Sequence, residues 1–231
     1  MKRRLVLLDI DGTILLSAGA GKRAIFAALT PEVDDVAVWE GIRFDGKTDP
    51  QIVREMLEGA GRPAPSRERI DALCHRYAGL LEEELALNGH RTRVLPGIHV
   101  LIERLEQESC VVLGLLTGNI SRGAELKLRA AGIAPDRFVV GAYGSDAAAR
   151  HELPPIAVAR AEPHFGRRPS GEEIVIIGDT PADVTCGQSL GARAIAVATG
   201  SYSTDELLAA GAYAAFDDLS RTDEVMAAIL R

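Results

Sequence analysis

Two aspartates near the amino terminus have the spacing of a nucleophile and an acid–base partner. Asp9 and Asp11 lie in the run DIDGT at positions 9–13, directly after the apolar run 5–8. A carboxylate can form a covalent intermediate with an electrophile, and a second carboxylate nearby can move the protons that this reaction needs. A lone aspartate is more often a turn or helix-cap residue. The interpretation therefore depends on what the rest of the chain brings to the same place.

Short apolar runs recur along the chain, each followed by a helical pattern. They span residues 5–8, 111–116, 139–142, 174–177 and 194–198. Runs that are apolar at every position are typical of strands covered on both faces, and alternating strands and helices predict a parallel sheet. We therefore expect an α/β fold, with a Rossmann-like parallel sheet and helices on both faces. Among those helices, we expect Ser121 to be the N-cap of one that ends near Gly132, and another to span residues 182–190 and end at Gly191.

The segment 17–93 interrupts this alternation. It has helical patterns at about 20–29, 49–60 and 66–87, and no convincing buried strand. We therefore expect two units. Residues 1–16 and 94–231 would form the α/β core, and residues 17–93 would form an inserted α-helical cap.

Polar residues follow most of the predicted strands. In an open parallel sheet these positions meet at one edge, where ligands bind. The positions after these strands include Asp9, Asp11, Thr117, Gly118, Asn119, Arg150, Asp179 and Asp183. Carboxylates gathered there raise one another's pKa unless a cation neutralises them, and oxygen ligands without His or Cys suit Mg²⁺. A hydroxyl at Thr117 and a guanidinium at Arg150 would bind phosphoryl oxygens, so the set predicts a Mg²⁺-dependent phosphoryl-transfer site.

These motifs resemble those of the haloacid dehalogenase superfamily, and the resemblance covers essentially the whole chain. Its first motif, DxDGT, matches positions 9–13. Its second motif, a hydroxyl residue after an apolar strand, matches Thr117, and its fourth, GDxxxD, matches Asp179 and Asp183. The motifs occur in order, each at the end of a predicted strand.

The third motif departs from the family pattern, which normally has a lysine. Arg150 stands before the helix that leads to the fourth motif, where that lysine is expected, and Arg160 is the competitor within that helix. We favour Arg150, because arginine stays charged and binds phosphate with two nitrogens, so the role survives the change.

The resemblance implies a role for each matched residue. Asp9 would attack phosphorus and become an aspartyl-phosphate, while Asp11 would protonate the leaving oxygen and then activate water. A Mg²⁺ ion would be held by the Asp9 and Asp179 carboxylates and the Asp11 main-chain carbonyl, with Asp183 acting through water or by holding neighbours. The phosphoryl group would be bound by Thr117, Gly118, Asn119 and Arg150.

The resemblance also narrows the activity. Dehalogenases of the superfamily lack the second aspartate, so Asp11 points to phosphate ester hydrolysis, with a phosphomutase as the alternative. The insertion resembles the C1-type cap, which closes over the site, and the arrangement most resembles phosphoglycolate phosphatases. The run 46–49 lies where this family keeps a substrate-specificity loop. Arg43 and Lys47 would meet an anionic leaving group, although solvated loop charges are as good an interpretation.

Other classes of function fit less well. A dinucleotide-binding interpretation of Gly19 and Gly21 fails because no strand ends there, and a non-catalytic binding protein would normally lose one of the two motif aspartates. A net charge of −7 argues against a nucleic-acid partner, and no apolar stretch is long enough to cross a membrane. Three cysteines without metal spacing fit a cytoplasmic location. We expect a small phosphate ester as the substrate, and a monomer or homodimer.

Overall fold

The chain folds around a six-stranded sheet in which every neighbouring pair is parallel. The computed structural model describes residues 2–231, and the strand order is β5-β4-β1-β6-β7-β8. The strands are β1 Arg4–Leu8, β4 Val111–Thr117, β5 Val140–Tyr143, β6 Ile174–Gly178, β7 Arg193–Val197 and β8 Ala214–Phe216. The predicted fold class is therefore confirmed. The edge strand β8 was not predicted from the sequence, because it is three residues long and two of them are alanine, which is not enriched in strands.

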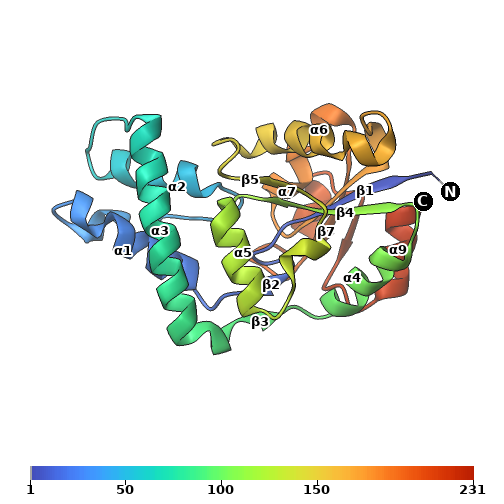
Figure 1. Ribbon diagram of the computed structural model, residues 1–231, viewed down its shortest axis with the longest axis horizontal. Coiled ribbons are helices and arrows are strands. Elements are labelled where there is room, and N and C mark those ends of the chain that lie inside the picture. The colour runs from blue at the N-terminus through green and yellow to red at the C-terminus, as the bar shows by residue number, and fades with distance from the viewer. Residues whose placement is uncertain (1) are drawn as a thin grey trace.

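Helices cover both faces of the sheet (Figure 1). One face packs against α4 Ile98–Gln107, α5 Ser121–Ala130 and α9 Thr222–Leu230, and the other against α6 Leu153–Phe165 and α7 Pro181–Cys186, with α8 Thr204–Ala209 beside α7. In β1, Val6 and Leu8 pack into the hydrophobic cluster on the side of α4, α5 and α9, whereas Leu5 and Leu7 pack into the cluster on the side of α6 and α7. Burial on both faces explains why this strand is apolar at every position.

A helical segment lies beyond one end of the sheet (Figure 1). Its helices are α1 Ala20–Leu29, α2 Asp49–Gly59 and α3 Arg67–Asn88, which pack around a hydrophobic cluster that also takes in Ile120 and Leu126. The strands β2 Leu15–Leu16 and β3 Arg93–Val94 pair antiparallel, so both connections to the segment lie side by side. The boundaries of a separate cap remain a prediction.

The longest helix described, α3, is amphipathic. Leu73, Tyr77, Leu81 and Leu85 recur at a spacing of one helical turn and are buried, while charged residues occupy the other face. In residues 2–231, no helix combines the length and the apolar character needed to cross a membrane.

Two helix boundaries differ from the sequence prediction. Ser121 is the first residue of α5 rather than its N-cap, and the preceding Ile120 offers no side-chain acceptor. Instead, Asp49 Oδ2 of the helical segment accepts a hydrogen bond from the Ile120 backbone nitrogen at 2.8 Å. A residue distant in sequence therefore supplies the cap, which local pattern cannot reveal. The helix predicted after Asp179 is also shorter, since α7 ends at Cys186 and a 3₁₀ turn follows.

Candidate active site

The site lies at the carboxyl ends of three adjacent strands. Asp9 follows β1, Thr117 ends β4 and Asp179 follows β6, and these strands are neighbours in the order β4-β1-β6. All three side chains are buried. Parallel strands present their carboxyl ends at the same edge, so residues distant in sequence meet there.

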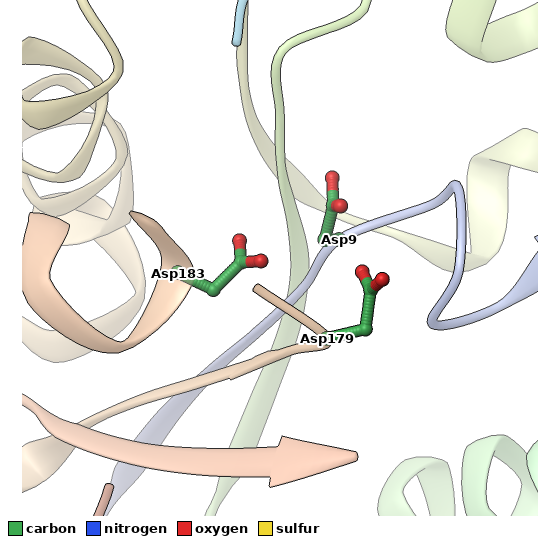
Figure 2. Close-up of side chains that lie close together, drawn as sticks. All are labelled: Asp9, Asp179 and Asp183. Atoms are coloured by element: carbon green, nitrogen blue, oxygen red, sulfur yellow. The ribbon is translucent and has the colours of Figure 1, made fainter. Parts of the chain in front are cut away.

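Three carboxylates converge at this edge (Figure 2). Asp9, Asp179 and Asp183 each offer one oxygen, and these oxygens lie within 4.8 Å of one another. Burial, reinforced by the neighbouring carboxylates, raises the pKa of Asp9 to about 6 and that of Asp179 to about 9. A bound cation would relieve this repulsion, and an all-oxygen donor set suits a hard divalent ion. The cluster is therefore able to hold a metal ion.

Two glycines make room for Asp179. Gly12 has φ +81°, and a Cβ there would lie 2.3 Å from Asp179 Oδ2. A Cβ on Gly200 would lie 1.8 Å from the same oxygen. The glycine of the first motif and the glycine that follows β7 are therefore needed for the carboxylate to occupy this position.

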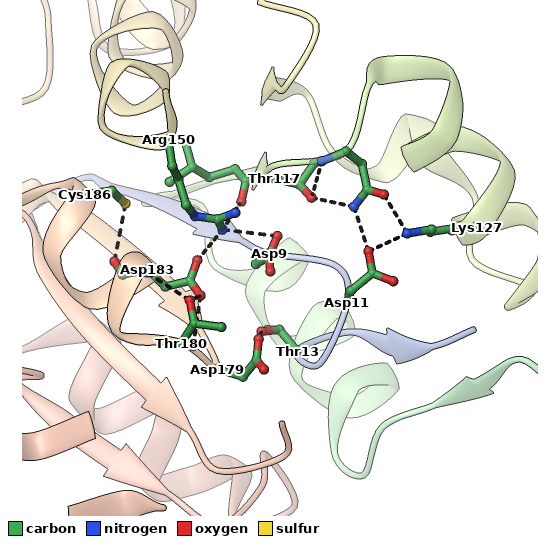
Figure 3. Close-up of polar contacts among 12 residues, drawn as sticks. Asp9, Asp11, Thr13, Thr117, Lys127, Arg150, Asp179, Thr180, Asp183 and Cys186 are labelled. Carbon is green, nitrogen blue, oxygen red and sulfur yellow. Dashed lines mark hydrogen bonds and ion pairs between the residues drawn. The ribbon is translucent and has the colours of Figure 1, made fainter. Parts of the chain in front are cut away.

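Arg150 is buried beside the carboxylates (Figure 3). Its Nη2 lies 3.3 Å from Asp9 Oδ1, and the same nitrogen forms an ion pair with Asp183. Burial alone would lower the pKa of Arg150, but Asp183 and Asp9 raise it overall, so the guanidinium is charged. Arg160, by contrast, is exposed on α6 and pairs with Asp146 at 2.6 Å.

Asp183 is fixed at the start of α7. Its Oδ2 accepts hydrogen bonds from the Thr180 backbone nitrogen at 3.0 Å and from Thr180 Oγ1 at 2.6 Å, while Oδ1 contacts Arg150. Because both oxygens already have protein donors, Asp183 is better suited to fasten Arg150 than to ligate a metal directly, although it lies within the carboxylate cluster.

Asp11 belongs to a second polar network on the other side of Asp9 (Figure 3). Its Oδ2 accepts hydrogen bonds from Asn119 Nδ2 at 2.8 Å and from Lys127 Nζ at 2.6 Å. Asn119 Nδ2 also donates to Thr117 Oγ1 at 2.8 Å. The network therefore joins Asp11 to the end of β4.

Sequence reasoning missed Lys127, although a signal was present. Ala124, Lys127, Leu128 and Ala131 follow the i, i+3, i+4, i+7 spacing of one helix face, and a lysine interrupts that otherwise apolar set. The structure buries Lys127 to 4% exposure. A buried lysine requires a partner, and Asp11 and Asn119 fill that requirement.

A cavity of about 410 Å³ opens over both networks. Its walls include Asp9, Asp11, Thr117, Gly118, Asn119, Arg150 and Asp179 from the core, together with Lys22, Lys47 and Tyr77 from the helical segment. Lys47 forms an ion pair with Glu55. Arg43 is not on the cavity wall; its side chain is 67% exposed and lies 3.5 Å from Asp45. The structure thus brings all but two of the predicted residues to the cavity, Arg43 lying outside and Asp183 behind Arg150.

One loop of the helical segment lies directly on the core. The Asp49 backbone nitrogen donates to Gly118 O at 2.8 Å, and Thr48 Oγ1 donates to Ala148 O at 2.5 Å. A Cβ on Gly118 would lie 2.1 Å from Lys47 O, so this approach requires glycine. The loop closes one side of the cavity.

Comparison with known proteins supports the fold that the sequence motifs predict. The family model described as HAD-hydrolase-like matches residues 146–222, which include Arg150 and the fourth motif. None of the curated proteins compared with the chain matches it.

Several solved structures are similar over nearly the whole chain. A hydrolase from Pseudomonas syringae is 24% identical, with a TM-score of 0.73 over 97% of this chain and 99% of its own. CbbY from Rhodobacter sphaeroides, in complex with phosphate, is 19% identical, with a TM-score of 0.71 over 94% of this chain and 95% of its own. A predicted phosphoglycolate phosphatase from Haemophilus somnus is 18% identical, with a TM-score of 0.68 over 98% of this chain and 99% of its own. The resemblance predicted from the motifs is confirmed, and the chain has the fold of the haloacid dehalogenase superfamily.

Proposed function

We propose that the protein is a Mg²⁺-dependent phosphatase that hydrolyses a small phosphate monoester through an aspartyl-phosphate on Asp9. One observation carries the proposal: Asp9 belongs to the buried carboxylate cluster and contacts Arg150, and Asp11 borders the same cavity. A nucleophile, a cation for the phosphoryl oxygens and an acid–base group are the parts that phosphoryl transfer through a covalent intermediate requires.

The reaction would have two steps, formation of the aspartyl-phosphate and its hydrolysis. An Asp9 carboxylate oxygen bonds to phosphorus while the ester P–O bond breaks, and Asp11 gives its proton to the departing oxygen, which keeps the electron pair. In the second step, Asp11 takes a proton from water as the water oxygen bonds to phosphorus. The bond between Asp9 and phosphorus breaks with its electron pair returning to the carboxylate, and inorganic phosphate leaves.

The phosphoryl oxygens would meet donors from two elements. The Thr117 hydroxyl accepts hydrogen bonds from the backbone nitrogen and Nδ2 of Asn119, which leaves its own hydrogen free to donate, and Gly118 borders the cavity beside it. Arg150 supplies the positive charge, and its buried Nε has no hydrogen-bond partner among residues 2–231. Donors fixed in place before the reaction stabilise developing charge at little reorganisation cost.

The metal-ion site would be formed by Asp9, Asp179 and the Asp11 main-chain carbonyl, with Asp183 holding its neighbours. When bound, Mg²⁺ would offset the negative charge of the carboxylates and of the phosphoryl group. The raised pKa values of Asp9 and Asp179 support this assignment, because burial and the neighbouring carboxylates disfavour the ionised cluster more than Arg150 stabilises it.

The segment 17–93 would serve as a cap over the core formed by residues 1–16 and 94–231. The contacts of Thr48 and Asp49 with the core support a closed arrangement. Closure would exclude bulk water until the ester bond has broken and would strengthen the electrostatic interactions in the cavity.

We propose 2-phosphoglycolate as the first substrate to test. The resemblance to the Haemophilus somnus structure supports this choice, and the similar CbbY protein binds phosphate and, in a mutant form, xylulose-1,5-bisphosphate. Each of these ligands carries a phosphoryl group, which is the part that the core residues would recognise. The cap residues would select the leaving group.

The test is release of inorganic phosphate from a panel of esters, with Mg²⁺ or with EDTA. The panel contains p-nitrophenyl phosphate, 2-phosphoglycolate, sugar phosphates and nucleoside monophosphates. Hydrolysis that requires Mg²⁺ supports the proposal, and preference for 2-phosphoglycolate supports the specific substrate. No hydrolysis of any ester would favour the non-catalytic alternative, and return of the phosphoryl group to a sugar phosphate would identify a mutase.

A further inference from the structure

Lys127 lies in an unusual environment for a lysine. It is 4% exposed, and its neighbours in the helix, Leu126 and Leu128, are buried as well. Its Nζ donates to Asp11 Oδ2 and to Asn119 Oδ1, both at 2.6 Å. Ordering a lysine side chain and removing its charge from water is costly, so the position calls for a role beyond packing.

The three side chains form a closed triangle. Lys127 contacts Asp11 and Asn119, and Asn119 Nδ2 donates in turn to Asp11 Oδ2 at 2.8 Å. One oxygen of Asp11 therefore accepts from two donors, whereas its Oδ1 has no hydrogen-bond donor among residues 2–231. The Asp11 side chain is 42% exposed and borders the cavity. The triangle fixes which oxygen is held and which is free.

A second buried carboxylate lies nearby but is held differently. Asp49 is 8% exposed, and its Oδ2 accepts from the Ile120 backbone nitrogen at 2.8 Å. Lys127 acts on Asp49 only through its charge, while both of its hydrogen bonds go to the Asp11 network. If Lys127 served only to neutralise buried charge, Asp49 would be the carboxylate in greater need, because it is more deeply buried.

We propose that Lys127 is a positioning residue that, together with Asn119, orients Asp11 so that the free Oδ1 faces the leaving oxygen. The inference rests on the proposed phosphatase function. Oδ1 carries the proton that passes to the leaving oxygen as the P–O bond breaks, and it later receives a proton from water. A misaligned donor slows proton transfer most when the leaving group is poor, because a good leaving group departs without protonation.

The experiment compares two esters of similar shape, phenyl phosphate and p-nitrophenyl phosphate, in single-turnover assays with the full chain and Mg²⁺. Lys127→Met keeps the length of the side chain but removes its charge and hydrogen bonds, and Lys127→Arg restores both. Arg129→Met is the matched control, because Arg129 lies on the same helix, is 64% exposed and, within residues 2–231, pairs only with Glu125. Circular dichroism and thermal melting verify that each variant folds.

Lys127→Met should slow phenol release by about tenfold to a hundredfold. It should slow p-nitrophenol release by less than about threefold, and Lys127→Arg should recover part of the loss. In an Asp11→Asn background, Lys127→Met should have no further effect, because the residue acts through Asp11. Arg129→Met should match the wild type.

The inference would be overturned if Lys127→Met slowed both esters equally, or if it slowed the Asp11→Asn variant by as much as it slows the wild type. Either outcome would leave the phosphatase proposal intact. If Lys127→Met does not fold, the same comparison is made with Lys127→Arg and Lys127→Gln, where Gln keeps a donor without the charge. A wild type that hydrolyses none of the panel esters would instead overturn the phosphatase proposal on which the inference rests.

Discussion

The two acidic sides of the cavity differ in how their charge is balanced. On one side, the buried carboxylates of Asp9, Asp179 and Asp183 face the guanidinium of Arg150. On the other side, one carboxylate, Asp11, is matched by the ammonium of Lys127 and the amide of Asn119. The first side has more carboxylates than cationic groups and is suited to an external cation, whereas the second is balanced by the protein itself. The chain thus separates a side suited to a metal from a side whose geometry is set by its own side chains.

The most severe test of this comparison is Asp9→Asn. We expect turnover to fall by at least about a thousandfold, because the amide has the shape of the carboxylate but is a poor nucleophile. The melting temperature should not fall, because the substitution removes a carboxylate whose ionised form is already disfavoured by burial. That burial raises the pKa of Asp9 to about 6. Steady-state kinetics and calorimetry measure both. Normal turnover would exclude the covalent route.

Asp179→Asn and Asp11→Asn together separate the two sides. Asp179→Asn should weaken Mg²⁺ binding by about tenfold to a hundredfold, because it removes a carboxylate from the metal side. Asp11→Asn should leave Mg²⁺ binding nearly unchanged, since its main-chain carbonyl remains, while its proton-transfer role is lost. Isothermal titration of each variant with MgCl₂ gives the affinities. Equal weakening by both substitutions would contradict the separation.

The pH dependence of stability provides a further test. A carboxyl group whose pKa is raised on folding binds more protons in the folded state, so it lowers stability as pH rises from its unfolded to its folded value. For Asp9 and Asp179 these folded values are about 6 and about 9. We therefore expect the metal-free protein to lose stability between about pH 4 and about pH 9.

Added Mg²⁺ should counteract that loss. It binds the ionised carboxylates, so it should raise the melting temperature more at pH 8 than at pH 5. Thermal melts with MgCl₂ or EDTA across this range measure the effect, and CaCl₂ gives a comparison with a larger ion. A shift that is independent of pH would place the metal away from these carboxylates.

Gly118→Ala should disturb the contact between the helical segment and the core rather than either charge network. The new Cβ would lie 2.1 Å from Lys47 O, so the loop of the helical segment must move. We expect a loss of stability of about 1–3 kcal/mol and a higher KM. Chemical denaturation and steady-state kinetics test this. Gly132→Ala is the control, because a Cβ at that position meets no described atom within 4 Å. An unchanged KM would separate this loop from substrate binding.

Arg43→Ala should have the smallest effect. Arg43 is exposed and lies off the cavity wall, so its loss should change stability by less than about 0.5 kcal/mol and leave kinetics unchanged. Lys22 is the contrasting residue, because it borders the cavity with its Nζ 5.5 Å from the centre of the Phe26 ring. Lys22→Ala should raise KM for esters with an anionic leaving group. A larger effect from Arg43→Ala would show that the cap binds substrate in a different arrangement.

The sequence alone determined which residues end the strands at the site. Continuous apolar runs mark strands buried on both faces, and parallel strands bring their carboxyl ends to one edge. That reasoning is sufficient to bring Asp9, Thr117 and Asp179 together, and the motif order led to Arg150 rather than Arg160. The identity of the fold followed from the same residues.

Tertiary structure decided the contacts that no local pattern encodes. Lys127 and Asp11 are 116 residues apart, and Asp49 provides the acceptor at the start of α5 from another helical segment. Periodicity indicates which face of a helix is buried, but the distance between side chains on different elements depends on how those elements pack. Lys47 and Arg43 illustrate the same limit: their sequence positions are equivalent candidates, and only the packing of the helical segment places one of them at the cavity.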